Sequence, residues 1–316
     1  TNFYPSTGYM KYNWDCGLEL STMLLTYFQH TGDEAFVKET LLPIADQVVI
    51  FYDQHYPRTP DGQLHVSPSQ ALETWHTAED PVPVVAGLRV VLAGLLALPD
   101  SLTTNEQRDR WQRLLGEVKE LPIAEEAGKR WLKPAHVYSD KKNAENPEMY
   151  AVFPYPIYGV GKADLEIGRE TYARRGTQRT GGWQQDAIQA ALLGLTEQAK
   201  NYLLQNVTTE NLMGKPAELA KRPDSRFPAF WGPNFDWIPD QCNGSVILIT
   251  LQRMLMQTDG NAIRLLPAWP ADWNADFKLH APHNTMVEAR VVNGEVMDLK
   301  VTPESRRKDV VIIKAK

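Results

Sequence analysis

The feature that most constrains the fold is a series of apolar stretches that have the spacing of amphipathic helices and come in pairs. The first pair starts at Asp15, a candidate N-cap, and its two helices are separated by the turn residues Thr31-Gly32-Asp33. Further helices are expected at 82–98, 105–120, 164–175, 183–193, 195–205 and 244–257. Helical hairpins in series, joined by short turns, predict a mainly α domain. Hairpins arranged in a ring would form an α/α toroid, whose inter-helix loops at one end form a cleft.

The pattern changes after Asp259-Gly260, where apolar and polar residues begin to alternate. The expected strands are Met286–Val292, Val296–Val301 and Val310–Ile313. An Asn-Gly pair at 293–294 joins the first two, and this is the strongest short-range signal for a hairpin. We therefore expect two domains, an α/α toroid at 1–260 and a small β domain at 261–316.

Composition narrows the class of protein. The chain of 316 residues is 43% hydrophobic and 23% charged with a formal net charge of −6, which is typical of a soluble globular protein without a nucleic-acid partner. No apolar run approaches the roughly 20 residues of a membrane span. Cys16 and Cys242 leave a single disulfide open, and no spacing implies a metal or an organic cofactor, although calcium stays open. The first residue is Thr, so we expect a processed or truncated chain, compatible with a secreted or periplasmic enzyme.

The long segment from 56 to 80 is predicted to be a loop, and it contains the first candidate catalytic residue, Glu73. Leu72 and Trp75 flank this carboxyl group, and apolar surroundings raise a carboxyl pKa toward neutrality, as a general acid requires. His76 is a candidate hydrogen-bond partner for a sugar hydroxyl. The alternative interpretation is a solvated surface glutamate beside a structural histidine.

Two other predicted loops, 146–156 and 227–243, carry further candidates. Asp240 is suited to act as a general base that polar neighbours such as Asn243 keep ionised, but it is equally suited to be a helix N-cap. Glu148 competes with either carboxylate for its role. A glycosidase needs two carboxyl groups across the scissile bond, one protonated and one charged, and Glu73 with Asp240 would supply them.

Four tryptophans are candidate platforms on which a sugar ring could stack, with core packing as the alternative for each. They are Trp75, Trp183, Trp231 and Trp237.

The order of several motifs resembles glycoside hydrolase family 95. These motifs are Ser67-Pro-Ser with Glu73, Phe153-Pro154, Gly181-Gly-Trp183, Asp240 with Gly244, and the stretch DGNAIRLLPAWPADW at 259–273. The resemblance implies an (α/α)6 toroid with a C-terminal β domain and an inverting exo-glycosidase that releases a terminal sugar, chiefly from α-L-fucosides and in some members from α-L-galactosides. It also implies that Glu73 is the general acid and that Asp240 is the base.

The chain departs from that family in several places. The family's Asn-x-Asn segment near the start of the barrel has no counterpart before residue 15, and Pro147–Pro154 replaces its His-rich stretch. The family's N-terminal β-sandwich is missing, and fewer helices are expected than a toroid of six hairpins requires. We therefore expect either a C-terminal fragment of a longer enzyme, whose N-terminal part would be a partner, or a divergent relative.

Two other functions fit the same scaffold, because a fold does not determine a function. A polysaccharide lyase would need a Tyr or His base and a cation that neutralises a uronate; Tyr150, Tyr155, His76 and Arg179 are the candidates. A non-catalytic carbohydrate-binding fragment is the third interpretation. All three expect a carbohydrate as the binding partner.

Overall fold

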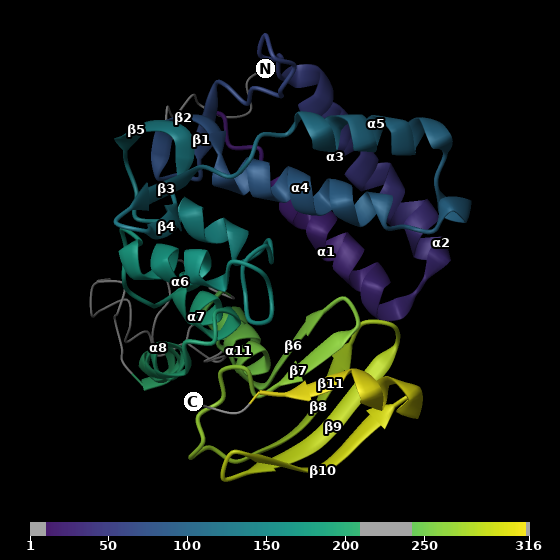
Figure 1. Ribbon diagram of the computed structural model, residues 1–316, viewed down its shortest axis with the longest axis vertical. Helices are drawn as coiled ribbons and strands as arrows, with labels where there is room; N and C mark the ends of the chain where they lie inside the picture. The colour runs from purple at the N-terminus through teal and green to yellow at the C-terminus, as the bar shows by residue number, and fades with distance from the viewer. Residues whose placement is uncertain (1–10, 209–241, 314–316) are drawn as a thin grey trace, which may run out of the picture. The chain divides into compact units, whose positions relative to one another are not determined.

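The chain divides into two units, and the computed structural model describes residues 11–208 and 242–313. The first unit comprises Thr1–Tyr158 and Lys162–Thr177, and the second comprises Gly159–Gly161 and Gln178–Lys316. Figure 1 shows helices and small sheets in the first unit, and helices followed by the C-terminal strands in the second. The expectation of a helix-rich chain with a C-terminal β region is confirmed, while the closed ring of six hairpins stays a prediction.

The first helical hairpin lies where the sequence predicts it, but the prediction of Asp15 as a capping side chain was wrong, because this side chain makes no capping hydrogen bond. Helix α1 (Cys16–Thr31) ends at Gly32, whose left-handed backbone (φ 67°) lets its N–H reach the carbonyl of Phe28. Asp33 then accepts a hydrogen bond from the N–H of Phe36 and starts a helical run. This run consists of α2 (Glu34–Phe36), a π-helical turn at Val37–Leu41 and α3 (Leu42–His55). Helix α3 packs against α1.

The second hairpin consists of α4 (Val82–Leu96) and α5 (Asn105–Glu117). Thr104 and Gln107 form a reciprocal capping box at the start of α5. Helix α4 is buried over most of its length and packs on both α1 and α5. Gly87 allows a close contact of α4, because a Cβ there would lie 2.8 Å from Cζ of Tyr155.

Two segments that we predicted to be loops or irregular contain strands instead. The segment 56–80 contains β1 (Ser69–Ala71) and β2 (Trp75–Pro81), and the segment 121–147 contains β3 (Ile123–Glu126), β4 (Lys129–Leu132) and β5 (Ala135–Lys141). Strands β1, β2 and β5 form one antiparallel sheet, and β3 pairs with β4. For β2 and β5 the prediction was wrong because these strands are far apart in the sequence and satisfy one another's backbone groups only in the folded chain.

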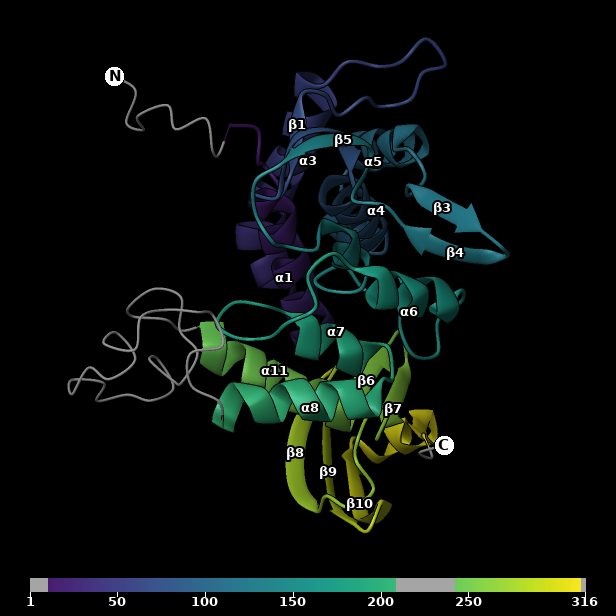
Figure 2. The ribbon, with the colours of Figure 1, turned by 90° about the vertical axis from the view of Figure 1, so that its left-hand side faces the viewer.

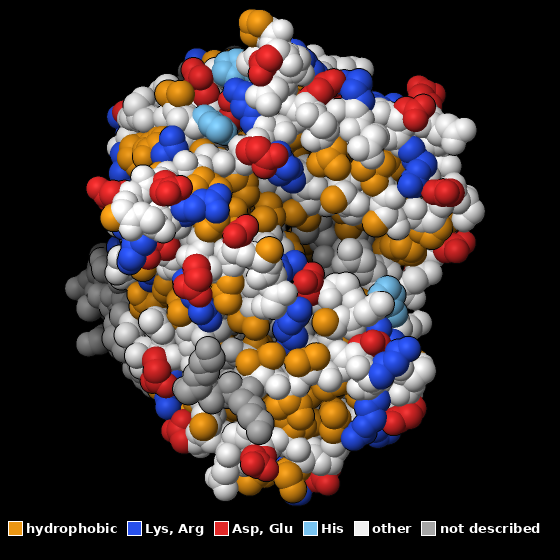
Figure 3. All heavy atoms as spheres, in the orientation of Figure 1, with side chains coloured by type: hydrophobic (Ala, Val, Ile, Leu, Met, Phe, Trp, Pro, Cys, Tyr) orange, Lys and Arg blue, Asp and Glu red, His pale blue; other side chains and the backbone are white. Residues whose placement is uncertain are grey.

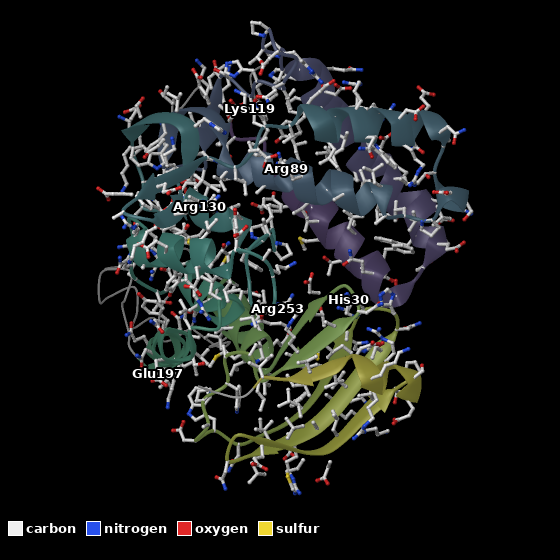
Figure 4. All side chains as sticks on the ribbon, in the orientation of Figure 1. His30, Arg89, Lys119, Arg130, Glu197 and Arg253 are labelled. Atoms are coloured by element: carbon white, nitrogen blue, oxygen red, sulfur yellow. The ribbon has the colours of Figure 1, made fainter. Side chains whose placement is uncertain are left out.

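Side chains fix these strands to the helices. The carboxylate of Asp80, at the end of β2, accepts hydrogen bonds from the N–H of Val66 and from Nζ of Lys119, both at 2.6 Å. Lys119 follows α5, and its carbonyl accepts a hydrogen bond from Arg89 on α4 (Figure 4). Helix α6 (Leu165–Arg174) packs against β4 (Figure 2), and a 3-10 turn at Pro147–Ala151 packs against α4.

The described part of the second unit combines three packed helices with two sheets. The helices are α7 (Asp186–Leu192), α8 (Thr196–Thr208) and α11 (Cys242–Leu255). Strand β6 (Met256–Asp259) follows α11 directly, so the helix ends two residues before the end that its apolar pattern predicts. It pairs with β7 (Ala262–Leu265), and β11 (Val310–Ile312) adds to β7 in parallel.

The second sheet contains β8 (Ala275–Ala281), β9 (Thr285–Val292) and β10 (Glu295–Thr302), in that spatial order. Asn293 and Gly294 both have positive φ, 50° and 78°, as the tight turn between β9 and β10 requires. The predicted Asn-Gly hairpin is therefore confirmed. Within the two described ranges, no helix is long and apolar enough to cross a membrane.

Candidate functional site

A pocket of about 250 Å³ lies within the first unit. Its walls come from β2, from β4 and β5 with their connection, from the residues around the 3-10 turn, and from the end of α6. Three aromatic side chains line it, Trp75, Trp131 and Tyr138. Two carboxyl groups, Glu145 and Glu148, line the same pocket.

One aromatic wall is built by Trp75 on β2 and Tyr138 on β5. The two rings meet edge to face with centroids 4.9 Å apart and an interplanar angle of 72°. Both are half-buried and pack on a small core of Ala71, Ala78 and Ala135. This packing holds the rings in place while part of each remains open to the pocket.

The third aromatic side chain of the pocket, Trp131 on β4, is covered by a cation. The guanidinium of Arg174 lies 3.9 Å from the Trp131 ring centroid, and its Nε donates a 2.6 Å hydrogen bond to Glu170. Arg174 is therefore oriented by two partners, and Glu170 offsets its charge.

Glu148 has the properties that a general acid needs. It lies in the first turn of the 3-10 helix and is only 7% exposed. Burial raises its pKa to about 7, although the N–H groups of Glu148 itself and Gly176, and the charges of Lys141 and Arg175, act in the opposite direction. Its carboxyl group therefore exchanges a proton near neutral pH.

Glu145 is the second pocket carboxyl group, and its contacts are structural. It accepts hydrogen bonds from the N–H of Glu73 at 2.7 Å and from Oγ1 of Thr74 at 3.0 Å, while its own N–H donates to the same hydroxyl. Burial, with a smaller contribution from the charge of Glu73, raises its pKa to about 7. These bonds tie the residues before the 3-10 turn to the tip of the β1–β2 hairpin.

Glu73 lies beside this pocket and does not line it. Its carboxylate accepts a 3.1 Å hydrogen bond from Nδ2 of Asn143, and its backbone N–H bonds to Glu145. Nε2 of His76 lies 3.1 Å from the carbonyl oxygen of Glu73. The structure thus brings together Glu148 and Trp75 in the pocket, with Glu73 and His76 next to them.

The remaining predicted site residues lie elsewhere in the chain. Trp183 is half-buried before α7, and Asn243 is 1% exposed in the first turn of α11, both in the second unit. Asp240, Trp231 and Trp237 lie outside the described residues.

Sequence reasoning missed most of the pocket wall, namely Trp131, Lys133, Tyr138, Lys141, Glu145 and Arg174. One signal could have revealed the β3–β4 hairpin. Ala127 and Gly128 both have positive φ and form its turn, and Ala-Gly between Glu126 and Lys129 separates two short segments of strand-compatible length.

A second polar cluster is buried near the start of α1. Burial, and then the charge of Glu19, raises the pKa of Asp15 to about 7. Burial also raises the pKa of Tyr150 and of Tyr155 well above the ordinary tyrosine value. Among the residues that the structure describes, no group of three His, Cys, Asp or Glu side chains could hold a metal ion.

Comparisons with known proteins point to a fold but not to a family. No protein-family model matches the chain, and no curated protein matches it. A solved structure described as "Putative kojibiose phosphorylase from human microbiome" is similar with a TM-score of 0.57 and 10% sequence identity. The match covers 90% of this chain and 46% of that one, so this chain spans less than half the length of its neighbour.

A likeness at this identity shows a shared fold. This chain therefore shares a fold with a protein that carries the name of a phosphorylase, and the likeness assigns no activity to it. The comparison does not single out glycoside hydrolase family 95.

Proposed function

We propose that this protein is a carbohydrate-active enzyme of the glycoside hydrolase or phosphorylase type, with its acid in the pocket of the first unit. One observation carries the proposal: the buried carboxyl group of Glu148, with a pKa of about 7, lines the same pocket as three aromatic rings. Mostly apolar, aromatic pockets with a few placed polar groups are typical of small-ligand sites. A neutral carboxyl group is what a glycosidic oxygen needs as its proton donor. The fold of the neighbouring structure gives additional support.

In this mechanism Glu148 donates its proton to the glycosidic oxygen as the bond from that oxygen to the anomeric carbon breaks. Water, or inorganic phosphate in a phosphorylase, forms the new bond to the anomeric carbon. A carboxylate accepts the proton that water loses. For inverting hydrolysis, Asp240 remains the base that the sequence predicts.

The finer part of the proposal concerns the substrate and the acid. A terminal α-L-fucoside or α-L-galactoside is the substrate class implied by the sequence resemblance, and Glu73 is the acid that it implies. We favour Glu148 over Glu73, because Glu148 lines the pocket whereas the Glu73 carboxylate bonds to Asn143 beside it.

The test is turnover of a panel of aryl glycosides, including the α-L-fucoside and the α-L-galactoside, each with and without inorganic phosphate. The variants are Glu148→Gln and Glu73→Gln, with Glu125→Gln on the exposed face of β3 as the matched control. We expect Glu148→Gln to lower kcat by a factor on the order of 10² or more, since general acid catalysis contributes about that much. Glu73→Gln should lower kcat by a smaller factor, and Glu125→Gln should leave kcat unchanged.

Unchanged turnover by Glu148→Gln would overturn the assignment, and loss of turnover in Glu73→Gln alone would return the acid to Glu73. Dependence on phosphate would identify a phosphorylase. Sugar binding without turnover of any glycoside would identify a carbohydrate-binding fragment.

The lyase alternative receives less support from this pocket. Of its candidate residues, Tyr150 and Tyr155 are held protonated by burial, and His76 and Arg179 do not line the pocket. An increase in ultraviolet absorbance from an unsaturated product would establish the lyase. A secreted or periplasmic location stays a prediction for either enzyme.

A further inference from the structure

Two lysines give the pocket a charge that a neutral sugar would not use. Lys133 lies between β4 and β5, and Lys141 is the last residue of β5; both line the pocket. Nζ of Lys141 lies 5.6 Å from the centroid of the Trp75 ring. It would also lie 3.4 Å from a Cβ at Gly176, whose N–H donates to the carboxylate of Glu148. The ammonium group therefore sits between an aromatic wall and the proposed acid.

Neither lysine has its charge neutralised by an ion pair within the described part of the chain. The third pocket cation, Arg174, differs because Glu170 binds it. The next residue along the chain also differs, since Nζ of Lys142 pairs with Asp140 at 2.6 Å. On the face drawn in Figure 3, basic and acidic side chains are interspersed. The two pocket lysines, which form no ion pair with a described residue, thus differ from the paired Arg174 and Lys142.

The two pocket carboxyl groups do not offset these charges when the enzyme is ready to react. The proposed acid must be protonated to act, and burial keeps both Glu145 and Glu148 partly protonated at neutral pH. The lysine charges are then in excess, and a bound anion would balance them. An anion there would also disfavour ionisation of Glu148, because like charges raise a carboxyl pKa.

We propose that this pocket selects an acidic sugar, a glycoside whose carboxylate or other anionic substituent lies against Lys141 and Lys133 while its ring lies against the aromatic wall. The inference rests on the proposed function and specifies its substrate class. Lysine suits this role as a compact charge that can follow the anion, while the fixed Arg174 keeps the wall in place. Inorganic phosphate is the other source of an anion at the same position, and the test separates the two.

The test compares the binding of matched methyl glycosides that differ only at C6, where one carries a carboxylate and the other a hydroxymethyl group. Glucuronide with glucoside, and galacturonide with galactoside, are the pairs, and inorganic phosphate alone is a further probe. Isothermal titration calorimetry and tryptophan fluorescence report binding to wild type, to Lys141→Gln and Lys133→Gln, and to the control Lys142→Gln. Circular dichroism verifies that each variant is folded.

We expect at least one acidic sugar to bind about tenfold more tightly than its neutral partner, the order of effect of a charge-assisted contact. Lys141→Gln should remove this preference, because it should weaken the binding of the acidic sugar more than that of its neutral partner. Lys133→Gln should reduce it, and Lys142→Gln should preserve it. Added salt should weaken the preference in wild type.

Equal affinity for acidic and neutral sugars would overturn this inference and leave the proposed function standing. A preference that survives both Lys141→Gln and Lys133→Gln would overturn it as well. Binding of phosphate that depends on Lys141, without any preference among sugars, would replace the acidic sugar with a phosphate site. Failure of every sugar to bind would overturn the proposed function together with this inference.

Discussion

Glu148 in the first unit and Glu288 in the second both lie near lysines, yet their pKa values shift in opposite directions. Glu288 on β9 accepts a hydrogen bond from Lys300 on β10 and pairs with Lys278 on β8, and these contacts lower its pKa. Lys141 acts in the same direction on Glu148, but burial outweighs it and raises that pKa to about 7. Burial therefore decides which of the two carboxyl groups has a pKa suited to proton transfer near neutral pH. The solvated Glu288 stays ionised there.

The same contrast extends across both units. In the first, a buried polar group such as Asp46 meets its hydrogen-bond partners inside the fold. In the sheet of the second, charged residues alternate with buried Val287 and Ala289 and face solvent. Substitutions of charged residues should therefore change the stability of the fold strongly where the residue is buried in the first unit, and only weakly on that sheet.

The largest expected effect that tests this contrast is that of Asp46→Ala. Asp46 accepts hydrogen bonds from Nε1 of the fully buried Trp111 at 2.8 Å and from Arg110 at 2.7 Å. Its removal leaves a buried donor and a cation unpaired, which should lower the free energy of unfolding by about 3–5 kcal/mol. Urea unfolding measures the change. The exposed Asp109→Ala on α5, the helix that carries Trp111, is the control, and equal effects of the two substitutions on the free energy of unfolding would contradict this contrast.

Stability should also fall as pH rises from about 5 to about 7. Burial raises the pKa of Glu148 from 4.5 to about 7, so across this window the folded state retains a proton that the unfolded state has lost. The free energy of unfolding should therefore decrease with pH, by about 3 kcal/mol for this group alone. Asp15 and Glu145, also raised to about 7, act in the same direction.

Urea unfolding at several pH values measures this slope, and Glu148→Gln should reduce it by the contribution of one proton. Groups with lowered pKa, such as Asp53, lose their stabilising effect only at lower pH. A slope that is flat, or one that Glu148→Gln does not change, would contradict the role given to burial.

Gly87→Ala tests how tightly the first unit packs around the buried hydroxyl group of Tyr155. A Cβ at Gly87 would lie 2.9 Å from both Oη of Tyr155 and Cδ1 of Leu18, so Gly87→Ala should cost about 1–3 kcal/mol. Gly116→Ala on α5 is the control, because nothing lies within 4 Å of its Cβ and alanine favours a helix. Thermal unfolding should show opposite or unequal shifts, and equal shifts would rule out close packing at Gly87.

The smallest expected effect is that of Glu288→Gln. Its ion pairs with Lys278 and Lys300 lie on the solvated face of the sheet, where such pairs contribute little. We expect no measurable change in melting temperature by calorimetry. A decrease as large as that of Gly87→Ala would show that the sheet depends on its charges as the first unit does.

The sequence by itself determined the elements whose signals are local. Helical periodicity located α1, α4 and α5, because 3.6-residue spacing and capping residues act within a few turns. Asn293-Gly294 located the hairpin of β9 and β10 for the same reason. Two pocket residues, Glu148 and Trp75, were also found, because a carboxylate or a tryptophan in a proline-containing segment is visible in the sequence.

Only the tertiary structure decided the rest of the pocket. Trp75 pairs with Lys141 across β2 and β5, and these segments are far apart in the chain, so no local pattern could show that the two side chains meet. The same holds for Glu145, whose contact with the N–H of Glu73 joins two distant segments. The pKa of a carboxyl group depends on how much water the whole fold removes from it, and the sequence alone does not contain that quantity. For this reason the residue types were predictable, but the choice between Glu73 and Glu148 required the folded chain.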